Sequence, residues 1–302
     1  MLRTSAGRSA ENVAVVPLGG AARDQVTLVA AGSSATVAAT VRGWVLPDPT
    51  MPDETNTGVR VGRTLTPYVG NLTVTTPGAV IDGLDVTGVI NVRANDVTIR
   101  NTRVQGQTSN TYTTPLIRMM DGYANLVVQD SELIPSSPNQ YQYGIIGWDF
   151  TLDRVDIAGV VDGVHVIGSD VVVRNSYIHD IRSYTVNGST THSDGIQIQI
   201  GTNLRVEDNT IVGGWNAAIQ VTQDCGPVGD FRVARNHMDG GWCTVNLAEK
   251  SYGPLAGVVL ADNTFGRATR LSDCAVISPT TTVLTDQDNY FTDGSPIRIR
   301  KG

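Results

Sequence analysis

The sequence predicts a right-handed parallel β-helix, a solenoid of stacked β-coils, over residues 64–302. A short apolar–polar–apolar element recurs along this stretch, and no segment keeps the apolar pattern of an amphipathic helix beyond about one turn. A turn-type Asn also recurs at intervals of 27, 27 and 26 residues, at Asn209, Asn236, Asn263 and Asn289. Repeats of about 20–50 residues are typical of solenoid proteins.

The recurring element carries two apolar residues five positions apart, with mostly polar residues between them. Its copies are bounded by Ile99 and Val104, Val128 and Leu133, Leu152 and Ile157, Val173 and Ile178, Val206 and Ile211, Val233 and Met238, and Leu260 and Phe265, with a degraded copy at 288–291. We expect the Asn column to adopt left-handed turn geometry and to hydrogen-bond from coil to coil, because Asn tolerates that backbone and carries an amide.

A second strand-like element lies between the copies of the first. Its apolar positions, which we expect to face the core, are Val164, Ile196, Ile219, Val245 and Val276. The next residues, which we expect to face outward, are His165, Gln197, Gln220, Asn246 and Ile277. Two short strands per coil of roughly 20–33 residues, with no helix between them, exclude a βαβ fold and predict coils stacked ~4.8 Å apart. The alternative fold is a β-sandwich, whose strands recur every 8–12 residues or so.

Three regions follow along the chain. Residues 1–46 predict a small β-rich amino-terminal anchor or cap, with short strands at 13–17, 26–30 and 35–41, and residues 47–63 read as a Pro- and Gly-containing linker. Residues 64–302 form the predicted β-helix. An anchor ahead of a β-helix is the layout of phage tailspikes and tail fibres, whereas a simple cap over the open end of a solenoid is the alternative.

Composition narrows the classes of partner. Lys and Arg number 22 against 29 acidic residues, so the net charge of −7 argues against a nucleic-acid partner. No segment approaches the ~18 apolar residues of a membrane span, and the first thirty residues carry no signal-peptide pattern. We therefore expect a virion protein, with the mature form of a secreted protein as the alternative localisation.

Two segments carry a resemblance to known proteins. Val171-Val-Val-Arg-Asn-Ser176 and Ser193-Asp-Gly-Ile-Gln197 resemble the pectate-lyase-like β-helix superfamily, and more narrowly the tailspike-like β-helix proteins of actinobacteria and their phages. His192-Ser-Asp-Gly-Ile196 is similar to the Asn-Thr-Asp-Gly-Ile element of polygalacturonase-type hydrolases, which implies that Asp194 is a catalytic acid. That family's adjacent Asp pair is missing at Ala217-Ala218, as are its Gly-His-Gly and Arg-Ile-Lys elements, and the lyase pattern Arg-x-Pro-x-x-Arg is missing too.

The candidate catalytic residues are Asp162, Asp194, His165 and His192. Asp162 and Asp194 fall in one column on neighbouring coils, so their mutual repulsion should raise one pKa or draw in a cation such as Ca²⁺. Paired acids are also the groups that glycoside hydrolysis uses. The alternative is that both carboxylates accept hydrogen bonds from turn amides, as Asx residues commonly do.

The candidate substrate-binding residues are amides and aromatic side chains. Gln197, Gln220 and Asn246 form a row that could meet the hydroxyls of a sugar chain, and exposed aromatic residues would add stacking surfaces. Trp148, Tyr184 and Trp215 are the aromatic candidates, and Tyr141, Tyr143 and Trp242 lie near the same face. Polar insertions at 105–115, 134–143 and 182–191 would build that face. Core filling or turn packing is the alternative role of each aromatic residue.

Cys243 and Cys274 fall in the same column as Asp162 and Asp194, on successive coils. That spacing lies within disulfide range, but a pair of stacked reduced thiols is the favoured state when nothing indicates an oxidising compartment. A zinc site is not expected, because no third ligand follows at metal-like spacing.

These observations predict a phage tail spike or fibre that binds, and could depolymerise, host cell-surface polysaccharide. We expect a homotrimer that attaches to other tail or virion proteins through the amino-terminal segment, with neither a nucleic-acid nor a membrane partner. The first alternative is a secreted polysaccharide hydrolase or lyase acting on an acidic glycan. The second is a structural or adhesion solenoid without ligand chemistry.

Overall fold

The computed structural model describes residues 51–107 and 113–302. The chain divides into two compact units, residues 1–46 and residues 47–302. The predicted amino-terminal anchor or cap therefore lies outside the described residues. In the described part of the chain, no helix is long and apolar enough to cross a membrane.

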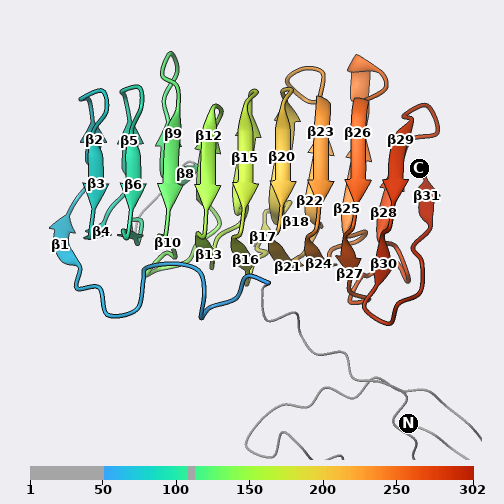
Figure 1. The fold of residues 1–302 in the computed structure, drawn as a ribbon, viewed down its shortest axis with the longest axis horizontal. Coiled ribbons are helices and arrows are strands. Elements are labelled where there is room, and N and C mark those ends of the chain that lie inside the picture. The colour runs from blue at the N-terminus through green and yellow to red at the C-terminus, as the bar shows by residue number, and fades with distance from the viewer. Residues whose placement is uncertain (1–50, 108–112) are drawn as a thin grey trace, which may run out of the picture. The chain divides into compact units, whose positions relative to one another are not determined.

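Residues 66–301 form a right-handed parallel β-helix, as predicted, with three long parallel sheets (Figure 1). Sheet A contains β1 (Thr66–Val69), β4 (Leu84–Thr87), β7 (Arg103–Val104), β10 (Glu132–Leu133), β13 (Asp156–Ala158), β16 (Tyr177–His179), β21 (Thr210–Gly214), β24 (His237–Gly240), β27 (Thr264–Phe265) and β30 (Tyr290–Phe291). Sheet B contains β2 (Leu72–Val74), β5 (Ile90–Val92), β8 (Thr114–Met119), β11 (Gln142–Gly147), β14 (Val164–Ile167), β19 (Asp194–Ile200), β22 (Ala217–Thr222), β25 (Val245–Ala248), β28 (Val276–Ser278) and β31 (Ile299–Lys301). Sheet C contains β3 (Val80–Asp82), β6 (Thr98–Arg100), β9 (Leu126–Gln129), β12 (Phe150–Asp153), β15 (Val171–Arg174), β20 (Leu204–Glu207), β23 (Gly229–Ala234), β26 (Ala256–Ala261) and β29 (Leu284–Gln287).

The register of sheet B is the one predicted from the sequence. Val164, Ile196, Ile219, Val245 and Val276 pair strand to strand, and each is fully buried. The residues that follow them, His165, Gln197, Gln220, Asn246 and Ile277, pair in the adjacent column. The apolar pattern fixes this register, because a shift by one residue would turn every apolar side chain out of the core.

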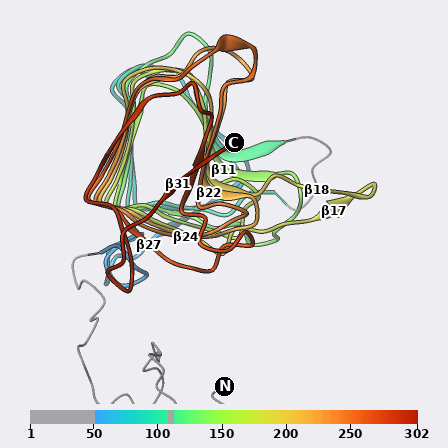
Figure 2. The ribbon, with the colours of Figure 1, turned by 90° about the vertical axis from the view of Figure 1, so that its right-hand side faces the viewer.

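The recurring element crosses the turn from sheet C to sheet A. Its first apolar residue lies one position before the end of a sheet C strand, and its second belongs to the next sheet A strand, as with Val206 in β20 and Ile211 in β21. The bounding residues of all seven full copies belong to the buried core. One continuous core therefore runs through the stack, which Figure 2 shows from the end.

A ladder of buried Asn side chains fills this turn. The Oδ1 atom of Asn236 accepts the backbone N–H of Asn209 at 2.9 Å, and Oδ1 of Asn263 accepts that of Asn236 at 3.0 Å. The predicted coil-to-coil hydrogen bonds are thus present, but the predicted left-handed backbone is not at these Asn residues. It belongs to the residue before each of them, such as Arg235 with φ 55° and Asp262 with φ 56°.

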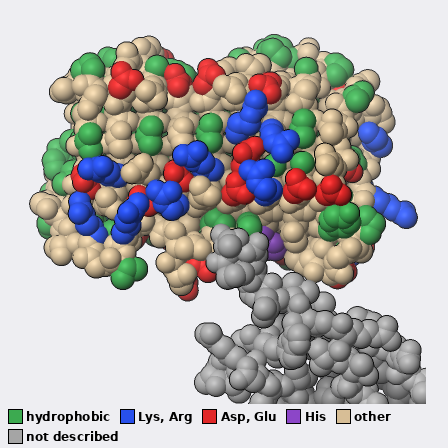
Figure 3. All heavy atoms as spheres, viewed as in Figure 1, with side chains coloured by type: hydrophobic (Ala, Val, Ile, Leu, Met, Phe, Trp, Pro, Cys, Tyr) green, Lys and Arg blue, Asp and Glu red, His purple; other side chains and the backbone are tan. Residues whose placement is uncertain are grey.

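Charged side chains gather in a band below the middle of the face in Figure 3. Many of them pair across successive coils, as Asp130 does with Arg154 at 2.7 Å and Asp208 with Arg235 at 2.7 Å. Such partly exposed ion pairs contribute little stability each. Their main effect is to place opposite charges on neighbouring coils.

The described part of the predicted linker, residues 51–63, contacts the solenoid (Figure 1). The backbone N–H of Gly58 donates to the carbonyl of Arg154 at 3.0 Å, and Arg60 forms an ion pair with Asp130 at 2.8 Å. A Cβ at Gly58 would lie 3.0 Å from Glu132, so this approach favours glycine. These contacts tie the segment to two coils.

The insertions lie on connections that lead from sheet A to sheet B. Residues 182–191 carry a small antiparallel hairpin of β17 (Thr185–Val186) and β18 (Ser189–Thr190), which projects from the coils in Figure 2. In the first insertion, residues 108–112 lie outside the described residues. A short 3-10 helix, η1 (Lys250–Tyr252), follows β25.

Candidate functional site

Asp162 and Asp194 lie at the sheet A side of sheet B, one coil apart. Asp194 is the first residue of β19, and Oδ1 of Asp162 accepts its backbone N–H at 2.9 Å. Oδ1 of Asp194 in turn accepts Nδ2 of Asn216 at 2.8 Å. The two residues are 1 % and 0 % exposed, so each carboxyl lies beneath the surface. This geometry is that of Asx side chains which fix the backbone of the neighbouring coil.

Burial dominates the electrostatics of this pair. It raises the pKa of Asp162, and it raises the pKa of Asp194 well above the ordinary value, with the charge of Asp162 as the second cause. Oδ2 of Asp194 is buried without a hydrogen-bond partner among the described residues. Tyr143, whose ring stacks on that of His165 at 5.6 Å, has a pKa raised by burial and then by the charge of Asp162.

The two candidate histidines flank the carboxyls. Nδ1 of His165 lies 3.9 Å from Oδ2 of Asp162 and is buried without a hydrogen bond among the described residues. His192 is exposed, with Nδ1 at 3.4 Å from Nε2 of Gln197. The structure therefore brings the four candidate catalytic residues together, and Asp162, Asp194, His165 and His192 are called the acid cluster below.

The acid cluster holds acids whose raised pKa values would suit proton donation. A general acid must touch its substrate, however, and neither carboxyl is open to solvent. Among the described residues no group of three or more His, Cys, Asp or Glu side chains is placed to hold a metal ion. A catalytic role and a bound Ca²⁺ stay predictions.

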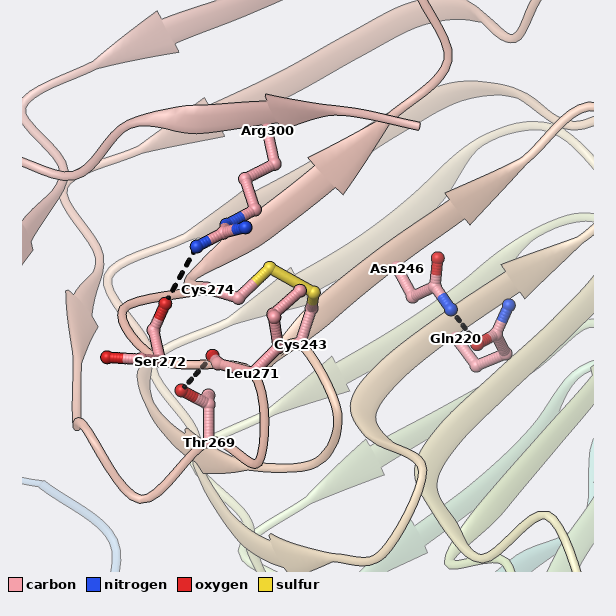
Figure 4. The surroundings of a disulfide bond; sticks show 8 residues. All are labelled: Gln220, Cys243, Asn246, Thr269, Leu271, Ser272, Cys274 and Arg300. Carbon is pink, nitrogen blue, oxygen red and sulfur yellow. Dashed lines mark hydrogen bonds between the residues drawn. A yellow bond between two sulfur atoms is a disulfide. The ribbon is translucent and has the colours of Figure 1, made fainter.

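The amide row faces outward from sheet B but is not open to solvent. Gln197 and Gln220 are only 3 % and 7 % exposed, and Asn246 is half-buried. Oε1 of Gln220 accepts Nδ2 of Asn246 at 2.8 Å, as Figure 4 shows, and Nδ2 of Asn216 at 3.1 Å. Gln220 and Asn246 thus bond to each other, while the side chain of Gln197 contacts His192 instead. The expectation of an open row of sugar-binding amides is therefore corrected.

The predicted aromatic residues differ in exposure. Trp148 is half-buried against Gly168, where a Cβ would lie 2.7 Å from the Trp148 side chain. Tyr184 is half-buried at the base of the hairpin, where its carbonyl accepts the N–H of Thr191 at 2.9 Å. Trp215 is 43 % exposed, which makes it the most open of the three.

Trp215 belongs to a cluster on the connections between sheets A and B. Trp242 lies on the next coil, where its N–H donates to the carbonyl of Asn216 at 2.7 Å, and it is 52 % exposed. The guanidinium of Arg270, from the following connection, lies 3.8 Å from the ring centre of Trp215 and 5.0 Å from that of Trp242. We call Trp215, Trp242 and Arg270 the tryptophan corner.

A disulfide bond joins two of the coils that carry this corner. Cys243 and Cys274 are bonded across successive coils with their Cα atoms 4.7 Å apart (Figure 4), so the expectation of a reduced pair was wrong. Cys243 directly follows Trp242, and Cys274 closes the connection that carries Arg270. The remaining cysteine, Cys225, is exposed and not disulfide-bonded.

The chain matches no protein-family model and no curated protein sequence.

Sequence reasoning missed two members of the exposed site. Arg270 lies in a connection of ten residues, 266–275, whose sequence matches none of the repeats. Trp242 was expected to lie near the face of the amide row, but it was not one of the candidate substrate-binding residues. The available signal was its place one residue before Cys243, because the column that aligns Cys243 with Ala217 sets Trp242 beside Asn216 of the previous coil.

Proposed function

We propose that this chain binds cell-surface polysaccharide through the tryptophan corner. The observation that carries the proposal is the exposure of two indole rings, 43 % for Trp215 and 52 % for Trp242, on successive coils of a rigid solenoid. Exposed aromatic groups that lie together mark binding sites, because their burial by a ligand is favourable. Indole rings also offer flat apolar surfaces on which sugar rings can stack.

The corner is held in place before any ligand arrives. Nη2 of Arg270 donates to the carbonyl of Trp215 at 2.7 Å, while its guanidinium lies against both indole rings. The Cys243–Cys274 disulfide joins the two coils that carry Trp242 and Arg270. A preorganised surface loses less conformational entropy on binding and therefore retains more of its interaction energy as affinity.

The proposal is one of binding without depolymerisation. The acid cluster is the group that hydrolysis would need, and its two carboxyls are buried and engaged with the backbone and with Asn216. The tryptophan corner holds Arg270 but no carboxylate pair of its own. A secreted hydrolase or lyase, and a solenoid without a ligand, remain as competing functions that the experiments below separate.

The setting of the protein is a further part of the proposal. We place it in the pectate-lyase-like superfamily, among the tailspike-like proteins of actinobacteria and their phages, as a homotrimer of a virion tail. The amino-terminal anchor predicted from the sequence of residues 1–46 fits this layout, because a spike needs a part that attaches to other tail proteins. Light scattering of the purified full chain should then give the mass of three chains, and a monomer would contradict the trimer.

The binding function is tested with isolated wall polysaccharide of actinobacterial strains. The fluorescently labelled full chain should sediment with whole cells, and soluble wall polysaccharide should compete for it. The chain should release no reducing ends or unsaturated products. Absence of binding to every strain and polysaccharide would overturn the proposal, and polysaccharide cleavage that is lost in Asp194→Asn would replace it by the hydrolase.

A further inference from the structure

A hollow of about 310 Å³ lies beside Trp215. Its lining comes from the ends of β21 and β24 and from four successive connections between sheets A and B, and includes Ser183, Trp215, Asp239 and Arg270. It adjoins the tryptophan corner but contains groups that the corner does not use. Its size is at the lower end of the range of small-ligand sites.

Four glycines line this hollow. Gly214 pairs with Gly240 across neighbouring coils, and Gly213 and Gly241 flank them in the lining. A Cβ at Gly214 would lie 2.1 Å from the carbonyl oxygen of Ala217, so the backbone here admits no side chain. Gly213, Gly240 and Gly241 have φ values of 85°, 98° and 83°, which L side chains rarely adopt. The floor is thus bare backbone.

Asp239 gives the hollow a fixed acceptor. Its Oδ1 accepts the backbone N–H groups of Gly240 and Ala268, each at 2.8 Å. Its Oδ2 accepts no hydrogen bond from the described residues, and a Cβ at Gly266 would lie 2.1 Å from that oxygen. The carboxylate is therefore held by one oxygen, while the other has hydrogen-bonding capacity to spare.

Arg270 gives the hollow a fixed donor. Of the guanidinium nitrogens of Arg270, only Nη2 has a hydrogen-bond partner among the described residues, the carbonyl of Trp215, and the guanidinium makes no ion pair with any of them. A guanidinium carries five N–H donors, so several remain for a ligand. The hydroxyl of Ser183, an exposed residue of the 182–191 insertion, adds a group that can donate or accept.

We propose that this hollow holds one uncharged pyranose residue of the bound glycan, an inference that rests on the proposed carbohydrate binding. One carboxylate and one guanidinium leave the lining without net charge, which suits a ligand that offers hydroxyls rather than a formal charge. Sugar hydroxyls donate to Asp239 and accept from Arg270, while the apolar side of the ring meets the indole of Trp215.

Titration of the full chain with methyl pyranosides tests this site. The probes are the methyl glycosides of glucose, galactose, mannose, rhamnose and N-acetylglucosamine, with methyl glucuronide as the charged comparison, followed by saturation-transfer NMR. At least one neutral glycoside should bind saturably and compete with the wall polysaccharide. Asp239→Asn should weaken it by roughly 10-fold or more, since a hydrogen bond to a charged group is lost. Its amide oxygen can still accept the N–H groups of Gly240 and Ala268, which preserves the fold.

A control variant and a second variant of the hollow complete the test. Asp224→Asn removes a carboxylate that pairs with Lys250 at 3.5 Å and does not line the hollow, so it should leave glycoside binding unchanged. Ser183→Ala, at an exposed position, should weaken binding without lowering the melting temperature. Unchanged binding in Asp239→Asn, or preference for the glucuronide over every neutral glycoside, would overturn the inference.

The experiments distinguish a wrong pyranose site from a wrong proposed function. Polysaccharide binding that no neutral methyl glycoside competes for would overturn the pyranose site and leave binding at the tryptophan corner intact. No binding to polysaccharide or to any glycoside would overturn both.

Discussion

The Asp162 carboxylate accepts the backbone N–H of Asp194 at 2.9 Å, while Oδ2 of Asp194 itself accepts nothing from the described residues. One acid thus fixes the neighbouring coil, and the other is buried with half of its carboxyl unsatisfied. A buried carboxyl of this kind costs less when protonated than when ionised. The pair therefore links the stability of the solenoid to pH.

Asp194→Asn should stabilise the fold at pH 8. The pKa of Asp194 is raised by burial in the folded state, so its contribution to stability is full below the ordinary value near 3.8 and falls as the pH rises through the folded pKa. The amide carries no charge, and its oxygen can still accept Nδ2 of Asn216. Urea unfolding at pH 4 and pH 8 should show that the variant gains over the wild type only at pH 8.

Asp293→Asn is the matched control with the opposite sign. Hydrogen bonds from Ser295 lower the pKa of Asp293 to about 2, so its contribution is present above 3.8 and lost as the pH falls toward 2. This variant should lose stability at pH 8. If Asp194→Asn also lost stability at pH 8, the raised pKa would be wrong.

Asn236→Ala should destabilise the solenoid by about 3 kcal/mol or more, because it leaves several buried backbone and side-chain groups unpaired. Asn236 is 1 % exposed, donates to Asn263 and to the carbonyl of Val206, and accepts two bonds from Asn209. The exposed Asn95, which accepts one backbone N–H at 3.0 Å, is the control, and Asn95→Ala should cost less than about 1 kcal/mol. Equal losses in urea unfolding would contradict a structural Asn ladder.

The Cys243–Cys274 disulfide determines how many thiols should react before and after reduction. Denatured but unreduced protein should titrate with one thiol, that of Cys225, and reduced protein with three. Replacing Cys243 and Cys274 together by Ser should lower the free energy of unfolding by about 2–4 kcal/mol. Three thiols before reduction would show that the two cysteines are not bonded.

The columns of sheet B were predictable because strands alternate strictly and adjacent coils align by their apolar residues. Val164 and Ile196 have to meet in the core, and their register then places His165 beside Gln197 and Asp162 beside Asp194. The Cys pair followed from the same column. The oxidation state of the two thiols did not follow from this column, because spacing alone shows only that a bond is possible.

Contacts made by residues of the connections between strands could not be predicted from strand alternation. Gln220 is buried and accepts a hydrogen bond from Asn216, a residue of the connection after β21, and this contact does not follow from strand alternation. Arg270 reaches Trp215 from 55 residues away, out of a connection without any periodic pattern. The left-handed backbone lies one residue before each Asn rather than at the Asn itself. The Asn side chain is needed inside the turn, where it hydrogen-bonds to the next coil.

Affinity of the Trp215→Ala/Trp242→Ala double variant for wall polysaccharide tests the central claim most directly. Tyr252→Ala is the control, since Tyr252 is 48 % exposed and lies outside the tryptophan corner. Aromatic residues at the centre of a binding site commonly contribute about 2 kcal/mol or more, so the double variant should bind at least ~30-fold more weakly, with an unchanged melting temperature and with Tyr252→Ala like the wild type. Wild-type affinity in the double variant would contradict binding at the tryptophan corner.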